Sequence, residues 1–186
     1  WVARFMDASE TETAIVTGHS LGALIALEIA ARHPLKVNKL VLIGVAEKMP
    51  VHADLLAAAK ANQPLGPELV VFWGLGKNSQ VGGHRQPGLW VQGASKTLLM
   101  LSKSGVLGND LAASNSYQGG LEAAKKILCP VKLILSANDK MTPLESGVKL
   151  GQAIADASID IIPNCGHMIM LESSEEVYQS MKGFVF

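Results

Sequence analysis

The chain contains the pentapeptide Gly18-His19-Ser20-Leu21-Gly22 between the apolar run Ala14-Ile15-Val16 and a helix-forming stretch from Leu21 to Arg32. Its pattern, Gly-x-Ser-x-Gly, is typical of a nucleophile elbow when a strand precedes it and a helix follows. On such a turn the serine backbone is strained and its hydroxyl is exposed at the end of the sheet. We expect both flanking glycines to be needed, because strand and helix pass closely there. Ser20 is therefore the candidate nucleophile; the alternative is a tight turn without a chemical role.

The composition is that of one globular domain with a substantial core: 186 residues, of which 48% are hydrophobic. Sixteen basic and sixteen acidic side chains give zero formal net charge. Such a balance argues against nucleic acid or an anionic membrane surface as the main partner. There is no apolar run long enough for a membrane span and no visible signal peptide, so we expect a cytoplasmic protein. Because the first residue is Trp1 rather than Met, a lost targeting segment stays open.

The two cysteines, Cys129 and Cys165, are expected to be free thiols. Cys129 precedes one expected strand and Cys165 follows its neighbour. Parallel strands would place them at opposite ends of the sheet, too far apart for a disulfide. This agrees with a reducing compartment.

Short runs rich in Val, Ile and Leu predict strands that are covered on both faces. They are Thr13–Thr17, Lys39–Gly44, Val131–Ser136 and Ser158–Pro163. Helical patterns separate or follow them, at Leu21–Arg32, at Thr142–Asp156 and after Ser173. Strands that alternate with helices predict an α/β fold with a mostly parallel sheet flanked by helices.

The long segment between the second and third strands predicts a helical lid. It runs from residue 45 to residue 128 and contains helix-prone pieces at 53–62, 95–102 and 121–127. This is too long for a simple connection inside a compact sheet. We therefore expect residues 1–44 and 129–186 to form the core, and residues 45–128 to form a cap over the carboxyl edge of the sheet.

A serine nucleophile needs a histidine to accept its proton and an acid to orient that histidine. Open α/β sheets bind ligands at the carboxyl ends of their strands. Asp139 follows the third expected strand and His167 follows the fourth. The chain order Ser20, Asp139, His167 is the order of the triads in this kind of fold.

Alternatives remain for the acid and the base. Asp139 could instead be a helix N-terminal acid that the helix dipole favours, and Glu47, after the second strand, is a rival acid. His167 could be an ordinary solvated loop histidine. We expect His19 to face away within the elbow, and His84 to be a loop residue rather than part of a pocket.

The backbone N–H of Leu21, directly after the nucleophile, is the predicted oxyanion-hole donor. Trp73, Trp90 and Met141 are candidates for an apolar acyl pocket, or else simple lid core. No Cys/His cluster has the spacing of a metal site, and no glycine-rich loop suits a phosphate. We therefore expect no cofactor and no metal.

Together these motifs resemble the α/β-hydrolase superfamily. Gly18–Gly22 is similar to its elbow, Asp139 with Pro143 to its acid loop, and Gly166-His167 to its histidine loop. The resemblance implies a serine hydrolase that cleaves small to medium carboxylic esters through an acyl-enzyme. The same triad would also serve an acyltransferase, a thioesterase or a C–C bond hydrolase, and the fold can also be a binding module without turnover.

One departure from the family's pattern concerns the start of the chain. Family members usually carry several strands before the elbow strand, and one early loop supplies the second oxyanion donor. Here only one expected helix, Trp1–Ala8, precedes it, so the chain resembles the C-terminal half of a hydrolase. Strand 13–17 would be a bare apolar edge, to be covered by a second copy or by a separate N-terminal half. With one oxyanion donor lost, turnover is expected to fall by about 100- to 1000-fold.

Overall fold

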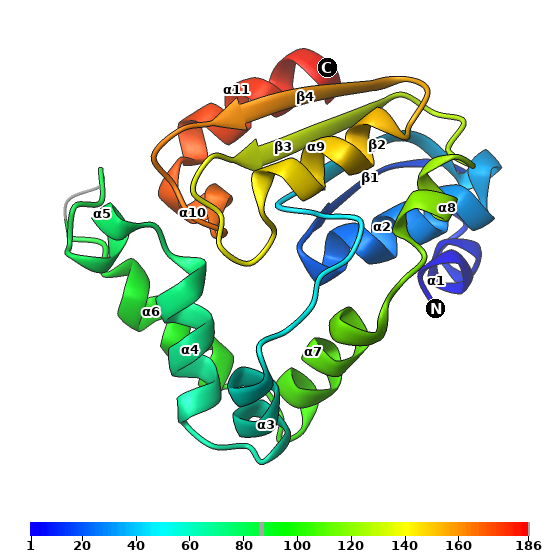
Figure 1. The fold of residues 1–186 in the computed structure, drawn as a ribbon. Helices are drawn as coiled ribbons and strands as arrows, with labels where there is room; N and C mark the ends of the chain where they lie inside the picture. The colour runs from blue at the N-terminus through cyan, green and yellow to red at the C-terminus, as the bar shows by residue number, and fades with distance from the viewer. Residues whose placement is uncertain (86–87, 186) are drawn as a thin grey trace.

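Four parallel strands form the sheet of the computed structural model, which describes residues 1–85 and 88–185 (Figure 1). Their order across the sheet is β1-β2-β3-β4, and every neighbouring pair is parallel. The strands are β1 (Ala14–His19), β2 (Val37–Ile43), β3 (Val131–Ser136) and β4 (Ala157–Ile162). The sequence predicted all four to within two residues at either end, and the parallel α/β fold is confirmed.

Helices cover both faces of the sheet (Figure 1). On one face, α2 (Leu21–Arg32), α8 (Gly120–Ala124) and α9 (Leu144–Gln152) share a buried cluster with Leu40 and Leu42 of β2. On the other face, α11 (Ser174–Val185) packs in a cluster with Val41 and Ile43. Alternate side chains of a strand point to opposite faces, so residues 40–43 of β2 supply apolar side chains to both clusters. The remaining core elements are α1 (Val2–Ala8), a 3-10 turn (Pro34–Lys36) and α10 (Ile169–Glu172).

A group of inserted helices lies apart from these layers, at the lower side of Figure 1. The inserted helices are α3 (Ala53–Lys60), α4 (Leu65–Gly74), α5 (Lys77–Gln80), α6 (Val91–Met100) and α7 (Val106–Ser116). The ends of the 45–128 segment instead pack with the core cluster, through Val45 and Ala46 at one end and α8 at the other. Helix α8, expected in the lid, contacts α2 and α9. The division into core and cap stays a prediction.

Strand β1 lies at one edge of the sheet and pairs only with β2 among the described strands. The sequence predicted this edge position, and Ile15 in the middle of β1 is 40% exposed. An open edge presents unpaired backbone groups to any further strand. Its pairing with a second copy or with additional chain stays a prediction. Among residues 1–85 and 88–185, no helix is long and apolar enough to cross a bilayer.

The two glycines of the elbow are not equivalent, which corrects the expectation that both are needed. A Cβ on Gly18 would lie 2.2 Å from the carbonyl oxygen of Gly22, whereas a Cβ on Gly22 would meet nothing within 4 Å. Strand β1 therefore approaches α2 so closely that only the strand residue must lack a side chain.

This difference between the two glycines can be tested with a matched pair of variants. Gly18→Ala should lower the free energy of unfolding by about 3 kcal/mol, because the new methyl group forces strand and helix apart. Gly22→Ala should be neutral or raise it by up to about 1 kcal/mol, since alanine favours the helix. Urea titration followed by circular dichroism measures both. Equal destabilisation by the two changes would contradict this account.

Candidate active site

Ser20 lies on a strained turn between the end of β1 and the start of α2. Its backbone has φ 55° and ψ −122°, a region that residues other than glycine rarely occupy. Ser20 N donates a hydrogen bond to the carbonyl oxygen of Ile43 at 3.0 Å, which ties the turn to β2. Such strain persists only where surrounding structure holds it, and it is concentrated at functional sites. The turn places Ser20 at the carboxyl end of the sheet, as predicted.

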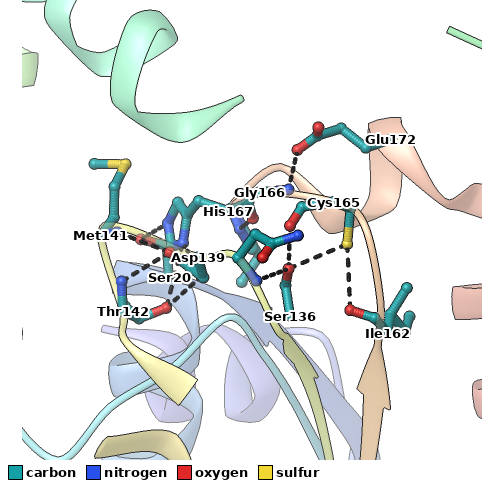
Figure 2. Close-up of polar contacts among 12 residues, drawn as sticks. Ser20, Ser136, Asp139, Met141, Thr142, Ile162, Cys165, Gly166, His167 and Glu172 are labelled. Carbon is teal, nitrogen blue, oxygen red and sulfur yellow. Dashed lines mark hydrogen bonds and ion pairs between the residues drawn. The ribbon is translucent and has the colours of Figure 1, made fainter. Parts of the chain in front are cut away.

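His167 connects Ser20 to Asp139 (Figure 2). His167 Nε2 lies 2.8 Å from Ser20 Oγ, and His167 Nδ1 lies 2.8 Å from Asp139 Oδ2. The side chains of His167 and Asp139 are almost completely buried, at 2% and 1% exposed. A carboxylate beside Nδ1 favours the tautomer that carries its proton there. Nε2 is then left with a lone pair directed at the serine hydroxyl.

Asp139 is held by its own loop. Its Oδ1 accepts hydrogen bonds from the backbone N–H groups of Met141 and Thr142, both at 2.8 Å. Its Oδ2 accepts a third from Thr142 Oγ1 at 2.6 Å. Burial alone would raise the pKa of Asp139, but the contacts with His167 and Thr142 outweigh it, and the pKa lies below its usual range. Asp139 is therefore an ionised carboxylate at neutral pH.

The rival acid is bound elsewhere. Glu47 Oε1 accepts a hydrogen bond from Lys149 Nζ at 2.7 Å, in an ion pair between the loop after β2 and α9. Asp139, by contrast, is in direct contact with His167. The geometry therefore favours Asp139 over Glu47 as the partner of the histidine.

His19 does not face away from the other predicted residues, so that expectation is wrong. Its Nε2 donates a hydrogen bond to the backbone carbonyl oxygen of His167 at 2.8 Å, and the centroids of the two rings lie 4.6 Å apart. Burial, with a smaller effect of the neighbouring His167 ring, lowers the pKa of His19 to about 4, so its ring is neutral at pH 7. Gly44 leaves room for both rings: its φ is 53°, and a Cβ there would lie 3.3 Å from each.

Leu21 is the first residue of α2. The first N–H groups of a helix have no acceptor within the helix, and they carry its partial positive charge. The Leu21 N–H therefore lies beside Ser20 with the properties that an oxyanion donor needs. Its role in an oxyanion hole stays a prediction.

A cavity of about 470 Å³ opens onto Ser20. The apolar side chains around it come mostly from the inserted helices and the loop before them: Met49, Pro50, Val51, Leu55, Trp73, Leu111 and Met141. Trp73 and Met141 thus line the cavity, as the acyl-pocket interpretation predicted. Trp90 does not line it and is 72% exposed at the start of α6. His84 is bonded through Nε2 to the carbonyl of Leu171, outside this cavity.

Thr142, which bonds Asp139, was not among the predicted site residues. A signal was available in Asp139 itself, because an aspartate in a turn commonly accepts hydrogen bonds from backbone N–H groups a few residues on. His19 carried no such signal, since its position depends on how β1 and the loop after β4 meet. Both cysteines are free, as predicted. Burial raises the pKa of the Cys165 thiol, which also contacts Ser136 Oγ at 3.2 Å, so this thiol is protonated at neutral pH.

The described residues contain no group of three or more His, Cys, Asp or Glu side chains that could hold a metal ion.

A family model described as the alpha/beta hydrolase family matches residues 1–180. The chain belongs to this family. It is similar to the pimeloyl-[acyl-carrier protein] methyl ester esterase of Aromatoleum aromaticum, with 28% identity over 185 residues that cover 89% of this chain and 71% of that protein. It is also similar to the 2-hydroxymuconate semialdehyde hydrolase of Pseudomonas putida, with 26% identity over 190 residues, 97% of this chain and 65% of that protein.

Solved structures of alpha/beta hydrolases have the same fold. The enol-lactonase from Burkholderia xenovorans superposes with a TM-score of 0.87 at 19% identity, covering 99% of this chain and 70% of that one. This alpha/beta hydrolase chain thus spans about two thirds of the length of the proteins it resembles. Esterases and other hydrolases both occur among these relatives.

Proposed function

We propose that this protein is a serine hydrolase that cleaves carboxylic esters through an acyl-enzyme. One observation carries the proposal: hydrogen bonds connect all three side chains. His167 Nε2 lies 2.8 Å from Ser20 Oγ, and His167 Nδ1 lies 2.8 Å from Asp139 Oδ2. This arrangement is recognised by its geometry and its roles rather than by sequence position. The pimeloyl-[acyl-carrier protein] methyl ester esterase among the relatives supports an ester as the substrate.

In the proposed reaction, Ser20 Oγ bonds to the ester carbonyl carbon while its proton passes to His167 Nε2. The carbonyl oxygen becomes an oxyanion, and the Leu21 N–H donates to it. When the C–O bond to the alcohol breaks, His167 returns the proton to the leaving oxygen. Water then attacks the acyl-enzyme with His167 as base again, which releases the acid and restores the serine hydroxyl.

Asp139 remains ionised during this cycle. It holds the Nδ1 proton of His167 and stabilises the imidazolium that forms when Nε2 takes the serine proton. Its low pKa, set by His167 and Thr142 against the effect of burial, keeps it charged across the neutral range. The apolar cavity beside Ser20 would receive the acyl group, with Trp73 and Met141 in its wall.

A second candidate is a hydrolase that cleaves a C–C bond with the same residues. The relatives favour it because the 2-hydroxymuconate semialdehyde hydrolase is similar over 97% of this chain. Only the chemistry of the substrate separates the two. Hydrolysis of 2-hydroxy-6-oxo dienoates with no turnover of simple esters would replace the first proposal by the second.

The test is a fluorophosphonate probe, which labels a serine only when the hydroxyl is activated. We expect one adduct, located at Ser20 by mass spectrometry, and none in a His167→Ala variant. The exposed histidine variant His33→Ala serves as the control and should label normally. Absence of any adduct on the wild-type chain would contradict the proposal and favour a binding module.

A further inference from the structure

A second buried carboxylate lies close to the proposed base, at the end of α10. Glu172 is 8% exposed. Its Oε1 accepts a hydrogen bond from Gly166 N at 2.9 Å (Figure 2). Its Oε2 accepts two more, from Gly76 N at 2.8 Å and from Ser79 Oγ at 2.9 Å. Gly166 directly precedes His167, whereas Gly76 lies just before α5 and Ser79 lies within it, so one side chain joins two distant segments.

The two segments also touch through their backbones. The carbonyl oxygen of Gly74, the last residue of α4, accepts hydrogen bonds from His167 N at 2.7 Å and from Met168 N at 3.1 Å. A Cβ on Gly166 would lie 2.4 Å from Gly76 N. The loop that carries the imidazole is therefore built directly against the end of α4, with no side chain between them.

We propose that Glu172 is a positioning residue for His167. By holding residues 74–79 against the histidine loop, it fixes where the imidazole lies. The inference rests on the proposed function, in which His167 Nε2 must stay within hydrogen-bond reach of Ser20 Oγ.

The chemistry of the contact requires a carboxylate. A backbone N–H points at each of its two oxygens, so both oxygens must be acceptors. A glutamine has only one carbonyl oxygen, and its NH₂ group would face one of these donors. A buried N–H without an acceptor is costly, so the two loops would separate.

This role makes the inserted helices part of the proposed catalytic assembly rather than only a cover. Trp73 lines the cavity beside Ser20, and the next residue, Gly74, binds the backbone of His167. A shift of α4 would therefore move the imidazole. Displacements of about 1 Å at a reacting group can cost about 100-fold in rate.

The main test compares Glu172→Gln with Glu175→Gln, an exposed glutamate on α11 whose carboxylate accepts a hydrogen bond from Gln179 Nε2. Glu172→Gln should lower kcat on a p-nitrophenyl ester by about 10- to 100-fold with KM within about threefold. The backbone amides of His167 and Met168 should exchange with deuterium at least about 10-fold faster. Glu175→Gln should change none of these quantities.

A second pair of variants disturbs the contact between the two segments while the charge of Glu172 is kept. Gly76→Ala keeps Glu172, but its Cβ would lie 2.8 Å from both Glu172 Oε2 and Gly166 N. We expect the same fall in kcat and the same loss of amide protection. Gly183→Ala, whose Cβ meets nothing within 4 Å on α11, is the control. This pair decides the question if Glu172→Gln fails to fold.

Normal kcat in a folded Glu172→Gln or Gly76→Ala protein would overturn the inference, as would a loss of stability without faster exchange at His167. Wild-type protein that neither labels nor hydrolyses esters would overturn the proposed function. In that case the exchange rates still report whether Glu172 orders the histidine loop.

Discussion

Ser20→Ala should reduce ester hydrolysis to the uncatalysed background, a loss of at least about 1000-fold in kcat. The alanine has no oxygen that could form the acyl-enzyme. A water molecule in that place would not be held toward His167, whereas the strained turn holds the serine hydroxyl there. Binding of an ester analogue should survive, because the remaining cavity wall is untouched. Stopped-flow and steady-state rates on p-nitrophenyl esters measure the effect.

The matched control is Ser116→Ala. Ser116 is exposed at the end of α7, and its hydroxyl donates a hydrogen bond to the carbonyl oxygen of Ala113 at 3.1 Å. This variant should retain full activity. If Ser20→Ala kept more than a tenth of the wild-type rate, Ser20 would not be the nucleophile and the acyl-enzyme mechanism would be lost.

Asp139→Asn should lower kcat by about 10,000-fold while the protein stays folded. The asparagine oxygen still accepts the N–H groups of Met141 and Thr142, so the loop keeps these two hydrogen bonds. Its NH₂ group, however, donates toward His167 Nδ1. This favours the tautomer with the proton on Nε2, which cannot accept the proton of Ser20. Asp156→Asn, an exposed change of the same kind, should leave kcat unaltered.

The pH dependence of stability gives an independent readout for Asp139. Its pKa is lower in the folded than in the unfolded chain, because the effects of His167 and Thr142 exceed that of burial. The carboxylate therefore stabilises the fold above the usual aspartate range, and this contribution is lost as the pH falls through the lowered pKa. The Tm of Asp139→Asn should accordingly depend less on pH between 7 and 3 than that of the wild type. Parallel Tm curves would contradict the stabilisation of the Asp139 carboxylate by its contacts with His167 and Thr142.

Local patterns in the sequence were sufficient for the strands and for the order of the proposed site residues. Strands buried on both faces have continuous apolar runs, as at Val131–Ser136. Ser20, Asp139 and His167 each follow a strand, and parallel strands bring their carboxyl ends to one edge. Their convergence was therefore predictable, although their catalytic roles remain proposals.

Contacts between distant segments were decided only by the tertiary structure. The ring of His19 lies against His167 because the end of β1 meets the loop after β4 there. Gly18 must lack a side chain and Gly22 need not, because strand β1 approaches α2 from one side. The contact of Glu172 with the inserted segment could not be found from a local pattern, since two of its three donors lie more than ninety positions away, in residues 76–79. Sequence periodicity reports which face of an element is buried, but the partner on that face is set by packing across the whole chain.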